Sequence, residues 1–480
     1  MSRTTVAAVV ADGLARAGTR RLFAAAGASA AVVEAARAHD VPIVDVAGVT
    51  AACIMAAVTG ELEDAPGAAA VSLAGGVTAV VDGAAHATRD RAPVIIVSDG
   101  AADARLLSPV TKASLVADAA SAGHWIAHAA QLSMAAPRGA VHLAILGDIV
   151  ASPTLPVATS CRRPPLPAAP PDTLDTLADA IARAARPVLV AGLELHEGDG
   201  KWVRALAETL PAPVLSTPKG KGAMPDPHPL ALGLLAASHP LVTRADLLVA
   251  LGVDPVEIPP GAWPGGIDTV HVGAAAPGDA LYRPVVEVIA DVALVIEELA
   301  PRLRGRTRAD WDVAELDRIK RALTGASPRA GGLTRRRVVT VVREATPAGT
   351  IATMDVPLAD AWQSVAPREL LIPNGAATAG FALPAAIAAA LVREDRRVVA
   401  LGAASGIEAM AGELSTMARL ATPIVVIGFD QDGSATSLSD SARAAGLVVS
   451  VAEDEAAFAT SFAQAWKAAR PALLVARVRG

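Results

Sequence analysis

The chain has 480 residues, of which 52% are hydrophobic and 2% aromatic, and its formal net charge is −6. This length exceeds one ordinary hydrophobic core and predicts about three domains. The mild charge and scattered basic residues argue against nucleic-acid binding, and charges, Pro and Gly interrupt every apolar run, which argues against a membrane span. Only Cys53 and Cys161 occur, so we expect a cytoplasmic protein with reduced thiols rather than a disulfide or zinc framework.

The first predicted element is an amphipathic helix within residues 1–20. One helical face would carry Val6, Val9, Val10, Leu14 and Ala15. Charged Asp12 and Arg16 lie elsewhere on the helix, which is typical of a mature amphipathic helix and not of a signal peptide.

Short β-rich runs then alternate with Ala-rich helical runs along the rest of the chain. Apolar runs of this length between helices indicate parallel strands that are buried on both faces. We therefore predict an α/β fold of three doubly wound parallel-sheet domains. The expected strands lie within 41–46, 68–75, 92–100, 140–146, 186–194, 246–252, 396–402, 422–429 and 471–478.

Two connections divide this pattern into three parts. The first is dense in Pro and reads as an extended linker, and the second is charged and partly helical. The predicted organisation is an α/β domain at 1–155, a Pro-rich linker at 156–175, a central α/β domain at 176–305, a linker at 306–333 and a third α/β domain at 334–480.

Four stretches carry a family resemblance. Residues 71–100 read as strand, Gly-rich turn, helix and strand, and residues 219–230 read KGKGAMPDPHPL. Residues 371–391 and 412–429 flank a glycine-containing loop. In this order, over nearly the whole chain, they resemble the thiamine diphosphate-dependent enzymes, and the acetolactate synthase branch in particular.

The resemblance implies a pyrimidine-binding domain, a central domain and a diphosphate-binding domain. It also implies an active site between the first domain of one subunit and the third domain of another, so we expect a homodimer or homotetramer. The cofactors of the family are thiamine diphosphate and Mg²⁺. Central domains of some relatives bind flavin or adenine nucleotides, and Lys219 and Lys221 are candidates to contact such an anionic nucleotide. A structural role of their Gly-rich loop is the simpler interpretation.

The family places a catalytic glutamate on the first domain, where it stabilises the imino tautomer of the aminopyrimidine. Val49 falls on that position, and the glyoxylate carboligases of the family also carry a valine there. Asp45 lies four residues earlier, where a solvated strand-end carboxylate is the simpler interpretation. On the same domain, Gly75 and Gly76 are expected to line the pocket.

The diphosphate loop of the family contains an Asp between two glycines, and that Asp binds the metal. Here Ala404 takes the place of the Asp, with Ala403 and Ser405 in place of the glycines and with Gly402 and Gly406 beside them. The preceding loop contributes Asn374, Gly375 and Ala379, and Ala379 stands where the family has a bulky residue that bends the cofactor.

The family's second metal ligand is an Asn that follows the next strand. Here the stretch contains Asp430, Gln431 and Asp432, which offer oxygen ligands for a relocated Mg²⁺ site. Asp and Gly after a buried strand are also ordinary turn residues, and we favour that interpretation.

Other polar residues have simpler explanations. His86 lies in the first domain near the expected cofactor and is a candidate acid or base, although a solvent-touching helix histidine is the alternative. His124 and His128 have the spacing of metal ligands but are expected at the surface. Ser98 and Ser405 lie in no known nucleophile motif, so serine catalysis is not expected.

Two hypotheses follow. In the first, the chain does not use thiamine diphosphate and Mg²⁺ in the usual way and has no cofactor. It retains a pocket for a small 2-oxo acid or related anion, with cofactor-independent chemistry or a non-catalytic partner role. In the alternative, it is a genuine thiamine diphosphate-dependent carboligase or decarboxylase of 2-oxo acids that tolerates Val49. As an enzyme it would be a C–C bond lyase or transferase.

Overall fold

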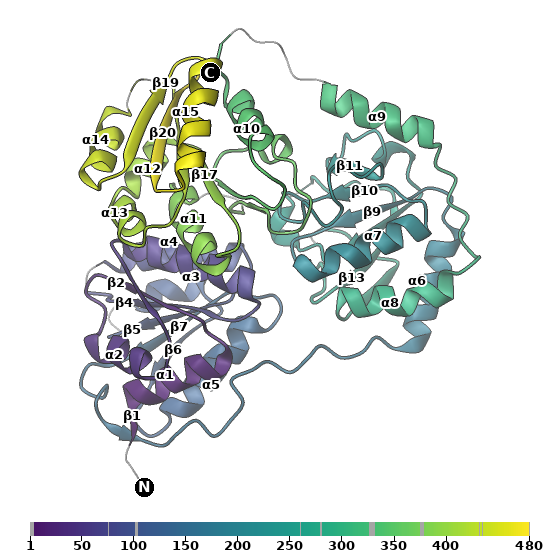
Figure 1. The fold of residues 1–480 in the computed structure, drawn as a ribbon. Helices are drawn as coiled ribbons and strands as arrows, with labels where there is room; N and C mark the ends of the chain where they lie inside the picture. The colour runs from purple at the N-terminus through teal and green to yellow at the C-terminus, as the bar shows by residue number, and fades with distance from the viewer. Residues whose placement is uncertain are drawn as a thin grey trace. The chain divides into compact units, whose positions relative to one another are not determined.

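A computed structural model describes residues 4–74, 76–100, 104–259, 261–278, 281–325, 332–374, 379–431, 433 and 435–479. The chain divides into two compact units (Figure 1). The first unit comprises Met1–Pro164, Ala352–Val356 and Pro373–Gly480, and the second comprises Pro165–Ile351 and Pro357–Ile372.

The N-terminal part of the first unit is built on a six-stranded parallel sheet of order β3-β2-β4-β5-β7-β6. Its strands are β2 (Leu22–Ala25), β3 (Ile43–Val46), β4 (Gly67–Val71), β5 (Val94–Ser98), β6 (Ala113–Ala117) and β7 (Ala140–Ile145). The helices are α1 (Val6–Ala17), α2 (Ala30–Ala38), α3 (Val49–Glu63), α4 (Val77–Arg89) and α5 (Ala122–Met134), and a short antiparallel pair joins β1 (Thr4–Thr5) to β8 (Pro153–Thr154).

The predicted first helix forms as α1, and its ends follow ordinary capping rules. The Thr5 side chain accepts a hydrogen bond from the Ala8 N–H, and Gly18 ends the helix with a φ of 94°. Val6, Val9, Val10 and Leu14 are buried, so the apolar face identified in the sequence packs into the core.

The C-terminal part of the first unit repeats the same strand order. Its sheet has the order β16-β15-β17-β18-β20-β19, which matches the first sheet position by position. The strands are β15 (Ile351–Met354), β16 (Leu370–Leu371), β17 (Val398–Ala403), β18 (Val425–Asp430), β19 (Val448–Ala452) and β20 (Ala472–Arg477). The helices are α11 (Ala382–Val392), α12 (Ala404–Ala409), α13 (Gly412–Arg419), α14 (Thr436–Ala444) and α15 (Glu455–Ala468).

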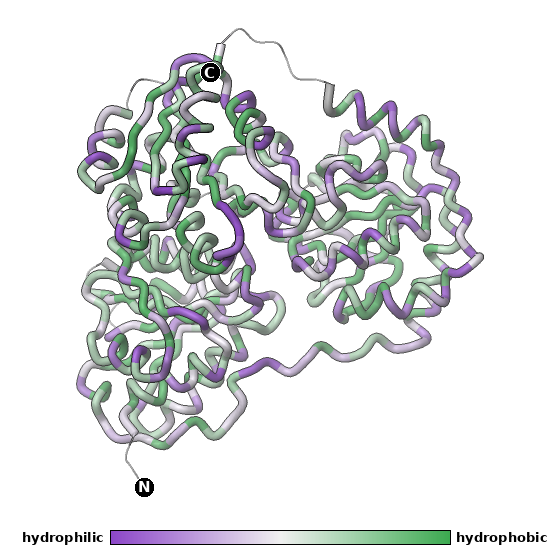
Figure 2. Tube along the Cα trace, in the orientation of Figure 1, coloured by the Kyte–Doolittle hydropathy of each residue, from purple (hydrophilic) through white to green (hydrophobic). Residues whose placement is uncertain are grey.

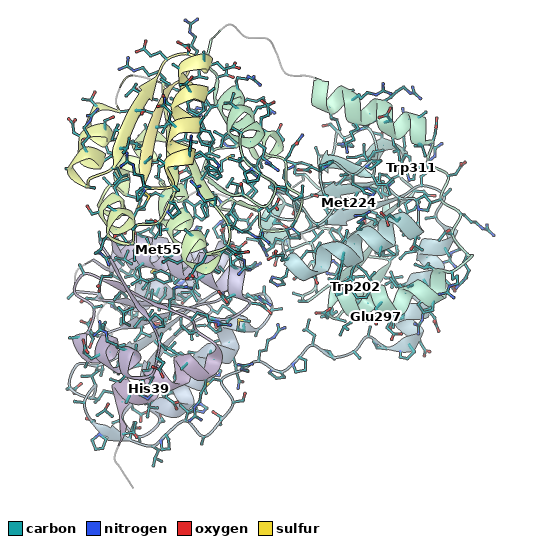
Figure 3. All side chains as sticks on the ribbon, in the orientation of Figure 1. His39, Met55, Trp202, Met224, Glu297 and Trp311 are labelled. Carbon is teal, nitrogen blue, oxygen red and sulfur yellow. The ribbon has the colours of Figure 1, made fainter. Side chains whose placement is uncertain are left out.

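Helix α3 joins the two parts of the first unit. It packs against both α4 and α11, and Met55, labelled in Figure 3, is one of its fully buried side chains. Small residues allow this close packing: a Cβ atom on Gly83 of α4 would lie 2.3 Å from the Cβ of Cys53. The low aromatic content of the chain is therefore compensated here by tightly packed Ala, Gly and Cys residues.

The second unit contains a six-stranded parallel sheet of order β11-β10-β9-β12-β13-β14. The strands are β9 (Pro187–Ala191), β10 (Val214–Ser216), β11 (Ala231–Leu234), β12 (Leu247–Leu251), β13 (Asp268–Gly273) and β14 (Val286–Ile289). The helices are α6 (Pro171–Arg183), α7 (Gly200–Thr209), α8 (Val292–Leu303), α9 (Val313–Gly325) and α10 (Arg335–Glu344). The strand order reverses between β9 and β12.

The predicted fold class is confirmed, because three parallel α/β sheets form and hydrophobic residues concentrate along their strands (Figure 2). All nine strands expected from apolar runs are present. Other strands were not predicted. The edge strands β6, β14 and β19 are only partly buried and carry mixed side chains, whereas β2, β10, β13 and β15 are largely buried but lie outside the predicted runs. Among the described residues, no helix is long and apolar enough to cross a membrane.

Candidate active site

The candidate site lies where β15, β17 and β18 end, at the carboxyl edge of the third sheet. Asp355 directly follows β15, Gly402 and Ala403 end β17, and Asp430 ends β18. In parallel α/β sheets, ligands bind outside the carboxyl ends of the strands. The topology therefore brings the predicted loop to the edge where a ligand is expected.

Two glycines, Gly402 and Gly406, lie beside the Asp355 carboxyl group, and a third, Gly380, packs against Gly406. A Cβ atom on Gly402 would lie 2.8 Å from Oδ1 of Asp355, and one on Gly406 would lie 3.5 Å from Oδ2. A Cβ on Gly380, whose φ is 84°, would lie 2.2 Å from the Gly406 carbonyl oxygen. The approaches at Gly402 and Gly380 are too close for a side chain, and the positive φ of Gly380 also favours glycine. We refer to residues 380–382 and 402–406 as the glycine cradle.

Asp355 is the acidic group of the glycine cradle, and it was missed in the sequence. The Ala403 N–H donates to Oδ1 at 3.3 Å, while Oδ2 is buried and accepts no hydrogen bond from any described residue. Burial raises the pKa of Asp355 to about 6, although nearby backbone N–H groups favour the ionised form. An acid immediately after a buried strand was the signal that could have identified it.

The loop residues that the resemblance assigned to the cofactor and the metal differ in their exposure. Ala404 is buried at the first position of α12, and Ser405 is exposed. Asp430 is buried and its Oδ2 lies 4.0 Å from Nε of Arg477 on β20. Gln431 is exposed. Asp432, Gly375 and Gly75 lie outside the described residues.

Val49, at the position of the family glutamate, is the first residue of α3. The preceding Gly48 donates its N–H to Oε1 of Glu413 on α13 at 2.8 Å. Burial raises the pKa of Glu413, and the backbone N–H groups of Ala47 and Gly48 oppose that shift. Asp45 is exposed, and its carbonyl oxygen accepts a hydrogen bond from Arg419. The Glu413 carboxyl group therefore lies close to Val49, but it accepts a hydrogen bond from the backbone N–H of Gly48, just before α3 begins.

The second contact between the two parts of the first unit involves His86 and Asn374. The Asn374 N–H donates to Oδ1 of Asp90 at 2.7 Å, and its Nδ2 donates to the Arg89 carbonyl at 3.1 Å. His86 is buried, with its ring 5.1 Å from that of Phe381. The expectation of a solvent-touching His86 was therefore wrong, because α4 packs against the segment before α11.

The remaining pocket residues are open to solvent. Gly76 has a φ of 138° at the start of α4, and a Cβ there would meet no atom within 4 Å. Ala379 is exposed. His124 and His128 are exposed on α5, as expected.

The described residues of the diphosphate loop offer no carboxylate at the position where the resemblance places the metal ligand. Ala404 has no oxygen ligand to offer, and no described group of three or more His, Cys, Asp or Glu side chains could hold a metal ion. The Asp355 carboxyl group lies beside the loop, with Oδ1 2.8 Å from a Cβ atom built on Gly402.

A second set of carboxylates lies at the carboxyl edge of the central sheet. Glu257 accepts hydrogen bonds from the Leu193 N–H at 2.8 Å, the Thr217 hydroxyl at 2.6 Å and the Lys219 N–H at 3.3 Å. Glu194 accepts from the Ala274 N–H at 2.7 Å. Burial raises the pKa of Glu257 to about 7. These carboxylates bind the strand-end amides themselves.

The lysines of the central domain have internal partners, consistent with the structural interpretation of their loop. Lys219 is buried near Glu257, and Nζ of Lys221 lies 2.6 Å from Oδ2 of Asp226.

Ser98 has a histidine partner that the sequence did not reveal. His142 Nε2 lies 2.8 Å from the Ser98 hydroxyl, and Nδ1 lies 2.8 Å from the Ser114 hydroxyl. Because Ser98 donates to the Gly100 carbonyl oxygen, the Nε2–H donates to Ser98 and does not act as its base. All of His142 is buried, so this network is structural.

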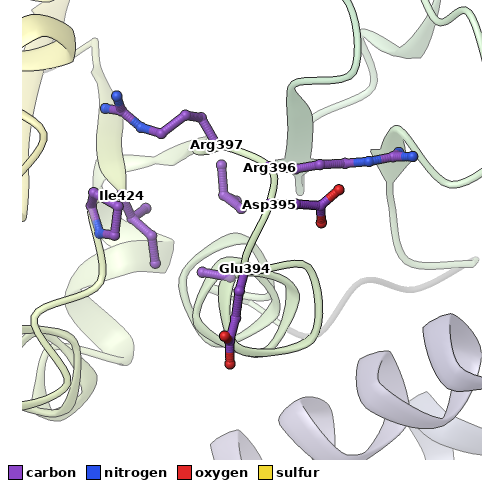
Figure 4. Close-up of a pocket in the computed structure, with 8 residues that line it drawn as sticks. Glu394, Asp395, Arg396, Arg397 and Ile424 are labelled. Atoms are coloured by element: carbon purple, nitrogen blue, oxygen red, sulfur yellow. The ribbon is translucent and has the colours of Figure 1, made fainter.

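One pocket lies away from these groups. It is lined by Glu394, Asp395, Arg396 and Ile424, among others, at the beginnings of β17 and β18 (Figure 4). Asp355 lies at the opposite edge of the sheet, so this pocket does not belong to the candidate site.

Three models of one family match the chain in order. They are the N-terminal TPP binding domain of the thiamine pyrophosphate enzymes at residues 4–117, the central domain at 174–299 and the C-terminal TPP binding domain at 351–438. Together they cover well over half of the chain. The chain belongs to the thiamine pyrophosphate enzyme family.

The relatives of this family member include acetolactate synthases. The catabolic acetolactate synthase of Raoultella terrigena is 28% identical over 87% of this chain and 81% of its own length. The acetolactate synthase of Bacillus subtilis (strain 168) is 27% identical over 88% and 80%. A Mycobacterium smegmatis protein described as a candidate thiamin diphosphate-dependent enzyme shares the fold, with a TM-score of 0.85, 21% identity and full coverage of both chains.

Proposed function

We propose that this family member binds a small 2-oxo acid or related anion and does not hold the magnesium complex of thiamine diphosphate in the usual way. The observation that supports the proposal is Ala404, which stands in the diphosphate loop where a metal-binding carboxylate is required. Val49 supports it as well, since valine cannot stabilise the imino tautomer of an aminopyrimidine.

In this proposal the ligand pocket is bordered by Val49, Gly76, Asn374 and the glycine cradle. The protein acts there by cofactor-independent chemistry on a C–C bond, or it binds the ligand without catalysis as a partner of another enzyme. Homo-oligomerisation is part of the proposal, because the family site is formed by two subunits. Sedimentation equilibrium of the full chain tests it, and a monomer at micromolar concentration would contradict it.

A second function is favoured by the comparisons, which support it better than the first. The matches to both TPP binding domains and the acetolactate synthase relatives support a thiamine diphosphate-dependent carboligase or decarboxylase of 2-oxo acids. In that case Asp430, Gln431 or Asp432 would replace the metal ligand, and Val49 would be tolerated.

Calorimetric titration with thiamine diphosphate, with and without Mg²⁺, separates the two functions. Micromolar binding that depends on Mg²⁺ at pH 7.5 would establish the second function and overturn the first. For the first function we expect no Mg²⁺-dependent binding, together with normal folding and a thermal shift on addition of a 2-oxo acid such as pyruvate.

A further inference from the structure

His124 and His128 on α5 are the most accessible histidines of the chain. All nine histidines lie within the described residues, and only these two are exposed. Others, such as His39 and His228, have a ring nitrogen within hydrogen-bonding distance of a protein oxygen. Neither His124 nor His128 forms a hydrogen bond with a described residue through its ring. Their ring nitrogens are therefore available to an ion from solvent.

The two rings lie side by side on one face of the helix. Residues four apart on an α-helix are neighbours, and the rings of His124 and His128 are parallel to within 1°, with centroids 6.1 Å apart. Trp125 is edge-on to both rings, at centroid distances of 5.3 Å and 6.3 Å. A metal ion about 2 Å from one nitrogen of each ring requires ring centroids about 5 to 6 Å apart. A small side-chain rotation therefore allows both rings to bind one ion.

The backbone and the charges around the pair also suit a cation. The opposite face of α5 is anchored in the core of the first sheet through residues such as Ile126 and Ala130. The helix contains no Lys or Arg, so no cation on it repels a divalent ion. Asp118, in the turn before the helix, is exposed and accepts a hydrogen bond from Nε1 of Trp125 at 3.4 Å. A carboxylate therefore lies beside the tryptophan that is edge-on to both rings, and its charge favours a cation there.

We propose that His124 and His128 form a surface site for a divalent transition-metal ion of the Ni²⁺, Cu²⁺ and Zn²⁺ class, bound through one nitrogen of each ring. Imidazole suits these ions, whereas Mg²⁺ prefers oxygen ligands. Two protein ligands leave the other coordination positions to water. The site goes beyond the proposed function, because it uses no residue of the glycine cradle and does not involve thiamine diphosphate.

The test is calorimetric titration of the untagged full-length protein with Ni²⁺ at pH 7.5. We expect one Ni²⁺ per chain with an affinity on the order of micromolar, because the second imidazole binds an ion that the first already holds nearby. His124→Gln and His128→Gln each remove one ligand and should weaken binding by about tenfold or more. His39→Gln is the matched control and should leave the affinity unchanged. His39 is a partly exposed histidine of the same domain (Figure 3), and its Nδ1 lies 2.9 Å from the Ala35 carbonyl oxygen.

A further variant distinguishes a chelating pair from two independent histidines. His128→Gln combined with Gln131→His, the respaced variant, keeps the number of histidines on α5 but places them seven residues apart, about 10 Å along the helix axis. One ion cannot be bound by both rings over that distance. The affinity of the respaced variant should therefore stay as low as that of His128→Gln.

Wild-type affinity in His124→Gln, in His128→Gln or in the respaced variant would overturn the proposal, as would a wild-type protein that binds no Ni²⁺ at millimolar concentration. Thermal unfolding without metal verifies that each variant folds. The result does not depend on whether thiamine diphosphate binds, so the proposed function and this metal site are tested independently.

Discussion

Glu257 in the second unit and Asp355 in the first unit have equivalent positions. Each carboxyl group lies at the carboxyl edge of a parallel sheet, next to backbone N–H groups at the ends of strands. They differ in how well they are satisfied. Glu257 accepts three hydrogen bonds through both oxygens, whereas Asp355 accepts one, at 3.3 Å, and leaves Oδ2 without a described partner.

This difference in hydrogen bonding indicates that Glu257 has a structural role and that Asp355 is the better candidate for a functional one. A fully bonded carboxylate occupies the amides that a ligand would need and fixes the loops around it, so Glu257 closes the edge of the central sheet. A poorly bonded one retains the capacity to change its protonation state or its partner. We therefore expect the second unit to have a structural role and ligand binding to occur at the glycine cradle of the first unit.

The largest effect should follow removal of the satisfied carboxylate. Glu257→Ala leaves the Leu193 and Lys219 N–H groups without their acceptor and takes a charge from the environment of the buried Lys219. We expect a loss of unfolding free energy on the order of 3 kcal/mol. Urea denaturation followed by tryptophan fluorescence measures it.

Glu297→Ala is the matched control, because Glu297 is an exposed acid on α8 of the same unit (Figure 3). It should change stability by no more than about 0.5 kcal/mol. Equal effects of the two substitutions would show that Glu257 is not the structural group that its hydrogen bonds indicate.

His142 extends the comparison to a second fully bonded group. Burial lowers its pKa from 6.5 to about 4, so the folded protein binds this proton less readily than the unfolded chain does. The stabilisation is therefore complete above pH 6.5 and is lost as the pH falls towards 4. The linkage is worth at most about 3 kcal/mol, at 1.36 kcal/mol per pKa unit.

His142→Gln retains hydrogen-bonding capacity but cannot ionise. We expect it to destabilise the protein at pH 7.5 and to flatten the decline of the melting temperature between pH 6.5 and pH 4.5. A variant with the same pH slope as the wild type would contradict the assignment of that slope to His142.

Much of the fold was predictable from the sequence, because buried parallel strands are long apolar runs such as those of β5, β12 and β18. The partly buried edge strands β6 and β19 have no such run, and the four-residue buried strands β2 and β15 were also missed. The site residues at 402–406 could be located by family resemblance, but the resemblance directed attention only to positions that the family uses. Asp355 therefore went unnoticed.

Contacts between distant segments set the other limits of prediction. The His142–Ser98 hydrogen bond joins residues on two different strands, and the buried ring of His86 packs against Phe381, which precedes α11. Neither pairing leaves a pattern in a single sequence. Gly75, Gly375 and Asp432 stay predictions, because they lie outside the described residues.

A smaller effect is expected at the under-satisfied carboxyl group. The pKa of Asp355 is raised to about 6 in the folded protein, so its ionisation opposes folding above that pH, and the penalty disappears as the pH falls below its ordinary value near 4. Asp355→Asn should therefore be more stable than the wild type at pH 7.5. The size of the pKa shift sets an upper limit of about 3 kcal/mol for the gain in unfolding free energy. Because Asp355 is partly exposed, solvent screening lowers the expected gain to about 1 to 3 kcal/mol. Chemical denaturation at pH 7.5 and pH 4 measures the difference, and an equal difference at both pH values would contradict it.

The smallest effect tests whether the carboxyl group lies where the glycines indicate. The three atoms nearest to a Cβ built on Gly402 are Oδ1, Oδ2 and Cγ of Asp355, at 2.8 to 3.3 Å. Gly402→Ala should therefore cost about 1 kcal/mol through overpacking, and the cost should largely vanish in an Asp355→Ala background. A double-mutant cycle on unfolding free energies measures this coupling. Strictly additive effects would mean that the carboxyl group does not contact Gly402. Asp355 would then not be in direct contact with this part of the glycine cradle.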